Sequence, residues 1–193
     1  MKIIGGQFKG RNFYMPSGIR PIQSLVTKSM FDILGQDMDG LIFLDLFAGS
    51  GSVGLEALSR GAKHCTFVEK DPKCSAVITK NLKLLDIGAY SLITADAFAA
   101  LKQIALQKQA YDIIFCDPPY DRELGKKSLK TLDAYAILHP TSVIIFKHEK
   151  YEILPEEYGR LRLFRQKKYG STVLSFYQLK EQPGETPPGA DIG

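Results

Sequence analysis

The sequence predicts an α/β protein built on a mostly parallel, seven-stranded sheet that ends in an antiparallel hairpin. Five short runs rich in β-branched and other apolar residues alternate with segments of helical pattern, which is typical of parallel strands buried on both faces. A glycine-rich turn directly follows the first run. The last two segments are strand-like and are joined by a tight turn, as in the edge hairpin of many α/β sheets.

The expected elements follow one another in strand-then-helix order. The predicted strands are 41–46, 64–69, 90–94, 111–116 and 142–149, and the predicted helices between them are 52–60, 71–85, 97–107 and 126–138. The hairpin joins 159–170 to 171–179. Ahead of the first strand, we expect an arm that holds strand-like pieces and then a helix around 22–34.

A chain of 193 residues has the length of one domain, which we expect to span 1–180, with a basic arm at 1–35 and a core at 36–180. The tail, 181–193, is rich in proline and glycine and is expected to be disordered. No apolar run reaches the roughly 18 residues of a membrane span, and the N-terminus lacks a signal-peptide core. The three cysteines form no CxxC pair, which indicates reduced thiols. A cytoplasmic protein is therefore expected.

Basic residues gather in two stretches that contain no acid, at either end of the chain. The net charge of +4 alone is a weak signal. The stretches are 1–31, with Lys2, Lys9, Arg11, Arg20 and Lys28, and 158–180, with Arg160, Arg162, Arg165, Lys167, Lys168 and Lys180. Such stretches suit a phosphate backbone, although solvated faces that balance acids elsewhere are an alternative.

The first strand runs into "DLFAGSGSVGLE", whose glycines match the dinucleotide fingerprint G-x-G-x-x-G. The fingerprint alone is weak, and Asp45 just before it would repel a pyrophosphate but suit a cationic group. Glu69 ends the second strand and can accept both hydroxyls of a ribose. Asp96 follows the third strand and can accept from the adenine amino group. Acids at three successive strand ends together predict S-adenosylmethionine (SAM), while each acid alone could be a helix N-cap.

The fourth strand ends in "DPPY", residues 117–120. An exocyclic base amine is a poor nucleophile because its lone pair is delocalised into the ring. The Asp117 side chain and the Pro118 carbonyl could accept its two N–H groups, while Pro118 and Pro119 stiffen the backbone. Tyr120 could stack on the base. The alternative is a simple Asp-Pro turn.

Other chemistries fit less well. Methylation at carbon would call for a cysteine after a proline, and the chain has none. His64, His139 and His148 have no metal-ligand spacing, so no metal is expected. The role of His148, near the end of the fifth strand, stays open.

The opening "MKIIGGQFKGRNF", the glycine loop, "FVEKD", "DPPY" and the closing "KYGSTVLSFYQL" are similar to bacterial small-subunit rRNA (guanine-N2)-methyltransferases, in order from Met1 to about Lys180. The resemblance implies a Rossmann-like class I methyltransferase fold that binds SAM. The residues implied or expected to bind the cofactor are Asp45, Phe47, Gly49, Ser50, Gly51, Glu69, Lys70, Asp96 and Ala97. Those expected at the catalytic site are Asp117, Pro118, Pro119 and Tyr120. The chain departs from the family at 22–25, which is Ile-Gln-Ser-Leu where the family is polar.

The main hypothesis is therefore an enzyme that transfers a methyl group from SAM to guanine N2 of 16S rRNA in the small ribosomal subunit or its assembly intermediate. It is expected to be a monomer. Phosphate contacts are expected from Lys9, Arg11, Arg20, Arg160, Arg162, Arg165, Lys167 and Lys168. Two alternatives stay open: a DNA methyltransferase acting on adenine N6 or cytosine N4, and an RNA-binding assembly factor with a vestigial SAM site.

Overall fold

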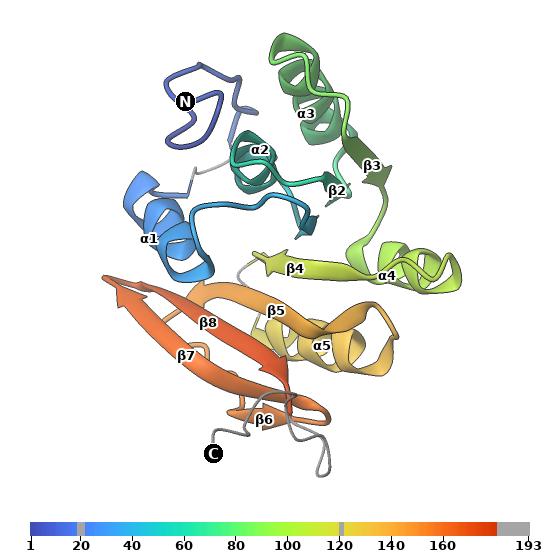
Figure 1. The fold of residues 1–193 in the computed structure, drawn as a ribbon. Helices are drawn as coiled ribbons and strands as arrows, with labels where there is room; N and C mark the ends of the chain where they lie inside the picture. Colours follow the sequence, from blue (N-terminus) through green and yellow to red (C-terminus); the bar gives the residue numbers. More distant parts are fainter. Residues whose placement is uncertain (19–21, 120–121, 181–193) are drawn as a thin grey trace, which may run out of the picture.

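The computed structural model describes residues 1–18, 22–119 and 122–180. Its centre is one mixed sheet with the strand order β3-β2-β1-β4-β5-β8-β7-β6 (Figure 1). The strands are β1 (Ile42–Leu46), β2 (His64–Glu69), β3 (Tyr90–Thr94), β4 (Tyr111–Cys116), β5 (Leu138–Glu149), β6 (Glu157–Tyr158), β7 (Leu161–Tyr169) and β8 (Thr172–Leu179). The predicted fold class is confirmed, and the two-residue β6 adds an eighth strand to the seven that were predicted.

The first five strands are parallel, and the last three are antiparallel. Parallel pairing places the carboxyl ends of β1 to β5 at one edge of the sheet, where α/β proteins bind ligands. The order reverses at β1, which has β2 on one side and β4 on the other. Ligand sites are expected at this switch point.

Helices cover both faces of the sheet (Figure 1). They are α1 (Ser24–Leu34), α2 (Ser52–Ser59), α3 (Pro72–Leu84), α4 (Ala97–Leu106) and α5 (Arg122–Ala134). Apolar residues of α1, α2 and α3 share one buried cluster with Phe43 and Phe115. Those of α4 and α5 share the other with Leu44 and Leu46. The alternation along β1 and β4 thus supplies both cores.

One helix boundary differs from the prediction. The helical pattern predicted 126–138, but α5 spans Arg122–Ala134 and residues from Leu138 onward belong to β5. Leu138 pairs with Tyr111, and the Tyr111 N–H donates to the Ile137 carbonyl. The apolar residues after Ala134 therefore join the sheet rather than the helix face.

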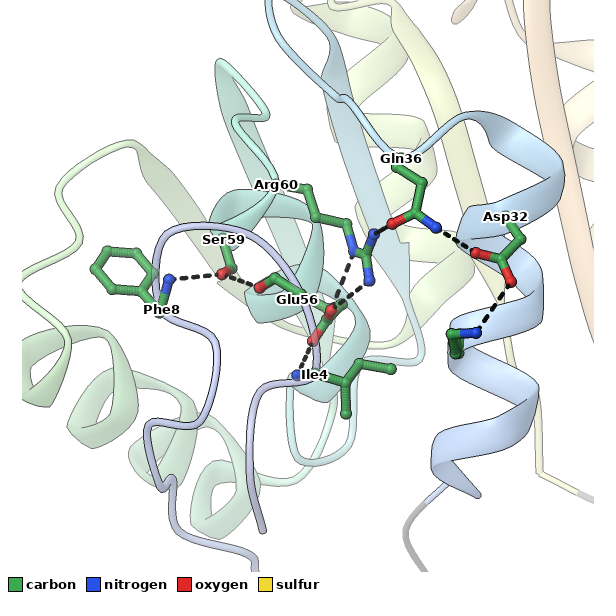
Figure 2. Close-up of polar contacts among 9 residues, drawn as sticks. Ile4, Phe8, Asp32, Gln36, Glu56, Ser59 and Arg60 are labelled. Carbon is green, nitrogen blue, oxygen red and sulfur yellow. Dashed lines mark hydrogen bonds and ion pairs between the residues drawn. The ribbon is translucent and has the colours of Figure 1, made fainter.

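The N-terminal arm is a loop docked on α2 rather than a set of strands. It contains one isolated bridge, between Lys2 and Asn12. The Ile4 N–H donates to Glu56 and the Phe8 N–H to the Ser59 hydroxyl, each at 3.0 Å (Figure 2). Gly6 has φ of 72° and lies so close to α2 that a Cβ there would be 1.8 Å from the Ser59 carbonyl oxygen. Contact with α2 thus fixes the path of the arm.

Beneath the arm, Glu56 forms a buried ion pair with Arg60 at 2.9 Å, each side chain being 4% exposed. Arg60 also donates to Gln36, which connects the pair to the end of α1 (Figure 2). We expect Glu56→Gln to lower the free energy of unfolding by about 3 kcal/mol, because it leaves the buried guanidinium without its counter-charge. Urea unfolding measures this loss.

The matched control for Glu56→Gln is Lys28→Gln, which leaves the contact of Asp32 with Gln36 in place. Lys28 also belongs to an i, i+4 ion pair, with Asp32, but these side chains are 65% and 40% exposed. Solvent screening makes such pairs worth less than about 1 kcal/mol. Equal losses in the two variants would contradict a special role for the buried pair.

Candidate active site

A cavity of about 530 Å³ opens at the carboxyl ends of the parallel strands. It is lined by the loops that follow β1, β2, β3 and β4, by Lys147 of β5 and by the end of the arm. Its lining includes the predicted residues Asp45, Phe47, Gly49, Ser50, Glu69, Lys70, Asp96, Ala97, Asp117, Pro118 and Pro119. The proposed cofactor and substrate residues therefore face a single space.

Gly51 does not line the cavity but shapes the loop that does. It is the N-cap of α2 in the left-handed region, with φ of 72°, and a Cβ there would be 2.9 Å from Ile78. A left-handed backbone this close to α3 calls for glycine. Its role is to turn the chain from β1 into α2 so that Gly49 and Ser50 face the cavity.

Asp45 is 2% exposed, and its carboxylate accepts from the Gly54 N–H in the first turn of α2 at 2.9 Å. Burial raises its pKa from 3.8 to about 8, against the lowering effect of the Gly54 hydrogen bond, and the nearby Asp117 and Glu69 raise it further. The carboxyl group is therefore mostly protonated at neutral pH. A cationic ligand beside it would favour the ionised form.

Glu69 joins the glycine loop to the next one. One carboxylate oxygen accepts from the Gly49 N–H at 2.6 Å, and the other accepts from the Asp71 N–H at 2.8 Å. These two bonds fix the orientation of the carboxylate. Because a carboxylate has about four acceptor positions, two remain for the hydroxyls of a ribose.

Asp96 has the helix-capping role that was considered as the alternative. It is the N-cap of α4, and its side chain accepts from the N–H groups of Phe98 and Ala99 at 3.0 and 3.3 Å. Both bonds use one carboxylate oxygen, Oδ1. The residue is exposed and lines the cavity, so capping and ligand contact are compatible.

Asp117 has a protein partner that the sequence interpretation missed. Lys147 Nζ donates to both of its carboxylate oxygens, at 2.7 and 2.9 Å. Burial raises the pKa of Asp117, and the Lys147 ammonium opposes that rise. A lysine with an acid 30 residues earlier leaves no local sequence signal, so only the pairing of β4 with β5 reveals it.

Arm residues Ser17, Gly18 and Ile22 also line the cavity, although the sequence interpretation did not assign them there. Ile22 belongs to the 22–25 departure, and Leu25 in the same stretch is 64% exposed. Arg20, Tyr120 and the 181–193 tail lie outside the described residues. Their predicted roles stay predictions.

His148 lies away from the cavity lining. It is 5% exposed, and its ring nitrogens contact the Ser175 hydroxyl at 2.8 Å and the Glu149 carbonyl at 2.9 Å. Burial lowers its pKa. These contacts assign it a packing role between β5 and β8.

The predicted phosphate-binding residues divide into two groups. Lys9, Arg11, Arg165, Lys167 and Lys168 are exposed. Arg160 is also exposed but closes the end of α5, donating to the Asp133 carbonyl and forming an ion pair with its carboxylate. Arg162 is half-buried on β7.

The sheet order, the glycine loop and the acidic strand ends around one cavity define the fold of the class I, SAM-dependent methyltransferases. The family model "Conserved hypothetical protein 95" matches residues 1–178. The chain belongs to the family of ribosomal RNA small subunit methyltransferase D, as the resemblance predicted.

Three relatives illustrate the match. The Escherichia coli (strain K12) ribosomal RNA small subunit methyltransferase D is 34% identical over 188 residues, covering 96% of this chain and 93% of its own length. The Bacillus subtilis (strain 168) protein YlbH is 38% identical over 183 residues, covering 93% of this chain and all of its own length. The solved structure of yhhF from Escherichia coli has a TM-score of 0.84 and 34% identity, covering 94% of this chain and 99% of its own.

None of the helices in the described part of the chain has both the length and the apolar composition that a membrane span requires.

Proposed function

We propose that this protein transfers a methyl group from SAM to the exocyclic N2 amine of a guanine in 16S rRNA of the small ribosomal subunit or its assembly intermediate. The observation that carries the proposal is that Asp117 and the Pro-Pro step face the same cavity as Asp45, Glu69 and Asp96. The relatives named as rRNA methyltransferases support the substrate class.

The cavity fits SAM by its size and by its acids. Its volume of about 530 Å³ lies within the usual range for ligand pockets. Glu69 would accept from the ribose hydroxyls and Asp96 from the adenine amino group. Asp45 would lie beside the cationic methionine end, where its charge has the largest effect because it is buried.

SAM binding should release about one proton per molecule at pH 7, because Asp45 has a pKa of about 8 and would ionise beside the cation. Because bound SAM would lower the raised pKa of Asp45, the affinity for SAM should increase with pH up to about pH 8. Calorimetry at pH 7 in buffers of different ionisation enthalpy measures the released proton. Asp45→Asn should abolish this release, and a release that persists in the variant would contradict the assignment.

The substrate amine would lie at Asp117, which accepts one N–H, with the Pro118 carbonyl accepting the other. This leaves the nitrogen lone pair to attack the methyl carbon as the bond from that carbon to the cofactor sulfur breaks, and the sulfur keeps the electron pair. The nitrogen then releases a proton, for which Asp117 is the nearest acceptor. A carboxylate also suits guanine, because N1–H and N2–H are adjacent donors, whereas adenine and cytosine place a ring acceptor beside the amine.

The exposed cations of β7 would hold the rRNA backbone. Lys147 pairs with Leu174 across the sheet, and Leu174 pairs with Lys167. Neighbouring strands lie about 4.8 Å apart, so the Lys167 backbone is about 10 Å from that of Lys147. At this separation, the extended side chain of Lys167 can reach the phosphates that flank a base bound at Asp117.

Arg165 and Lys167 lie two residues apart on β7 and share the face of Phe176 and Leu174, so replacing both with glutamine should weaken rRNA binding and flatten its salt dependence. Loss of two phosphate contacts lowers the slope of log K against log salt by about 1.4 to 1.8. Filter binding at several salt concentrations measures this slope. Glutamine at Lys102 and Lys108, on the α4 side of the sheet, is the matched control, and equal slopes for both pairs would contradict the proposed path.

The test of function is methyl transfer from labelled SAM to unmodified small ribosomal subunits, naked 16S rRNA and duplex DNA, with the products digested to nucleosides. Label in N2-methylguanosine supports the proposal. Label in N6-methyladenine or N4-methylcytosine from DNA would show that the proposed substrate is wrong and that the proposed methyl transfer to an exocyclic amine is right. SAM binding without transfer to any of the three would favour an assembly factor.

A further inference from the structure

The Asp117–Lys147 pair is built by strand register. Cys116 pairs with Phe146, so the next residues, Asp117 and Lys147, face each other across β4 and β5. The ammonium contacts both carboxylate oxygens, at 2.7 and 2.9 Å. The side chains are 11% and 23% exposed for Lys147 and Asp117. Limited solvent screening makes the pair stronger than a surface ion pair.

The charges around Asp117 differ on its two sides. On the β1 side, Asp45 and Glu69 are acids, and the electrostatic effect of Asp117 raises the pKa of Asp45. On the β5 side lies Lys147. Burial keeps the pKa of the neighbouring Cys116 thiol well above its usual value, so that group is neutral. Burial also lowers the pKa of His148, whose ring faces Ser175.

Without Lys147, Asp117 would be a poorly solvated acid beside Asp45. Burial favours the protonated carboxyl group. A protonated carboxyl has an O–H that would donate toward the incoming amine and lose acceptor capacity. Among the described residues that line the cavity, the cations are Lys70 and Lys147, and it is Lys147 that contacts Asp117.

We propose that Lys147 is a positioning residue for methyl transfer, which holds Asp117 ionised and correctly oriented before the substrate amine arrives. This inference rests on the proposed function, in that Asp117 is taken as the amine acceptor. A carboxylate has about four acceptor positions. Lys147 uses two, so the amine can be accepted while the ion pair stays formed.

The ion pair also bears on the proton released after transfer. Burial raises the pKa of Asp117, and the ammonium at 2.7 Å offsets part of that rise, so Asp117 is a weaker base than it would be without Lys147. The proton leaving the methylated nitrogen therefore passes on to water more readily, and the carboxylate is ready for the next substrate. Lys147 thus favours the ionised form of Asp117, which accepts a hydrogen bond from the amine, over the protonated form.

The experiment measures single-turnover methyl transfer across pH for Lys147→Met and Lys147→Arg. At pH 7 the Met variant should be slower by about 10-fold or more, because each unit by which the pKa of Asp117 exceeds 7 lowers its ionised fraction tenfold. Its acidic limb should move up by about one pH unit or more, so that much of the rate returns at high pH. The Arg variant should keep most of the rate because it restores the charge. SAM affinity should change less than about twofold in both variants, since the proposed cofactor contacts are untouched.

Lys150→Met is the matched control. Lys150 is an exposed lysine just after β5, and its replacement should change neither the rate nor the profile. An equal loss at every pH in Lys147→Met, or no rescue by arginine, would assign Lys147 a merely structural role. An unchanged rate would overturn the inference outright.

A second readout does not depend on the substrate. Carbon-13 NMR of the Asp117 carboxyl should show a higher pKa in Lys147→Met than in the wild-type protein. If the wild-type protein methylates no rRNA but this increase is observed, the proposed function fails while the effect of Lys147 on the charge of Asp117 stands. An identical titration in both proteins contradicts the inference, whatever the substrate.

Discussion

Asp117→Asn should reduce methyl transfer by about 1000-fold or more, because the substituted amide offers one acceptor and turns N–H donors toward an amine that needs acceptors. SAM affinity should stay within about threefold, since Asp117 lies at the substrate end of the cavity. Single-turnover transfer to small ribosomal subunits measures the first effect, and calorimetry measures the second.

Asparagine keeps the shape of the aspartate, so it separates chemistry from packing better than alanine does. Asp117→Ala should lose activity as fully but also lose stability, because it removes a carboxylate that forms a largely buried ion pair with Lys147. Loss of SAM binding and of transfer together in the asparagine variant would show that the acid is structural.

Asp45→Asn should have opposite effects on binding and stability. SAM affinity should fall by about 100-fold, equivalent to about 2.8 kcal/mol, because a buried charge facing a cation is removed. In the absence of SAM, the variant should be more stable at pH 8, with a Tm higher by at least about 4 °C. Ligand-binding sites often carry such a stability cost.

The raised pKa of Asp45 makes the stability of the protein depend on pH. Asp45 has a pKa raised from 3.8 to about 8 in the folded protein, so its stability contribution is present below about pH 4 and is lost as the pH rises to about 8. Thermal unfolding across this range should show a shallower loss in Asp45→Asn. Asp86→Asn, an exposed aspartate after α3, should leave the profile unchanged. Parallel profiles for all three proteins would contradict the assignment.

The sequence was sufficient to predict the strands and the acids that follow them. Strands β2, β3 and β4 match their predicted ranges residue for residue, because buried parallel strands are short apolar runs with distinct ends. Parallel pairing then brings their carboxyl ends together whatever the details of packing. For this reason Asp45, Glu69, Asp96 and Asp117 were all correctly predicted to share one edge.

What the sequence did not predict depends on contacts between distant residues. Lys147 lies in a strand that reads as an apolar run, and its partner is set by the β4–β5 register. The arm was predicted to hold strand-like pieces, but its path is fixed by α2, whose Glu56 and Ser59 side chains accept from the N–H groups of Ile4 and Phe8. Local propensity carries no information on either partner.

The docking of the arm also has a consequence for biosynthesis. The arm leaves the translating ribosome before its partners do, because Ile4 and Tyr14 bond to residues 52 and 67 positions later, in α2 and α3. Strand β1 must likewise wait for β4, since Phe43 pairs with Ile113. The basic arm is thus exposed beside ribosomal RNA, without the folded helices on which it docks, until more than half of the chain has been made. A nascent chain of this kind is predisposed to contact RNA before it is an enzyme.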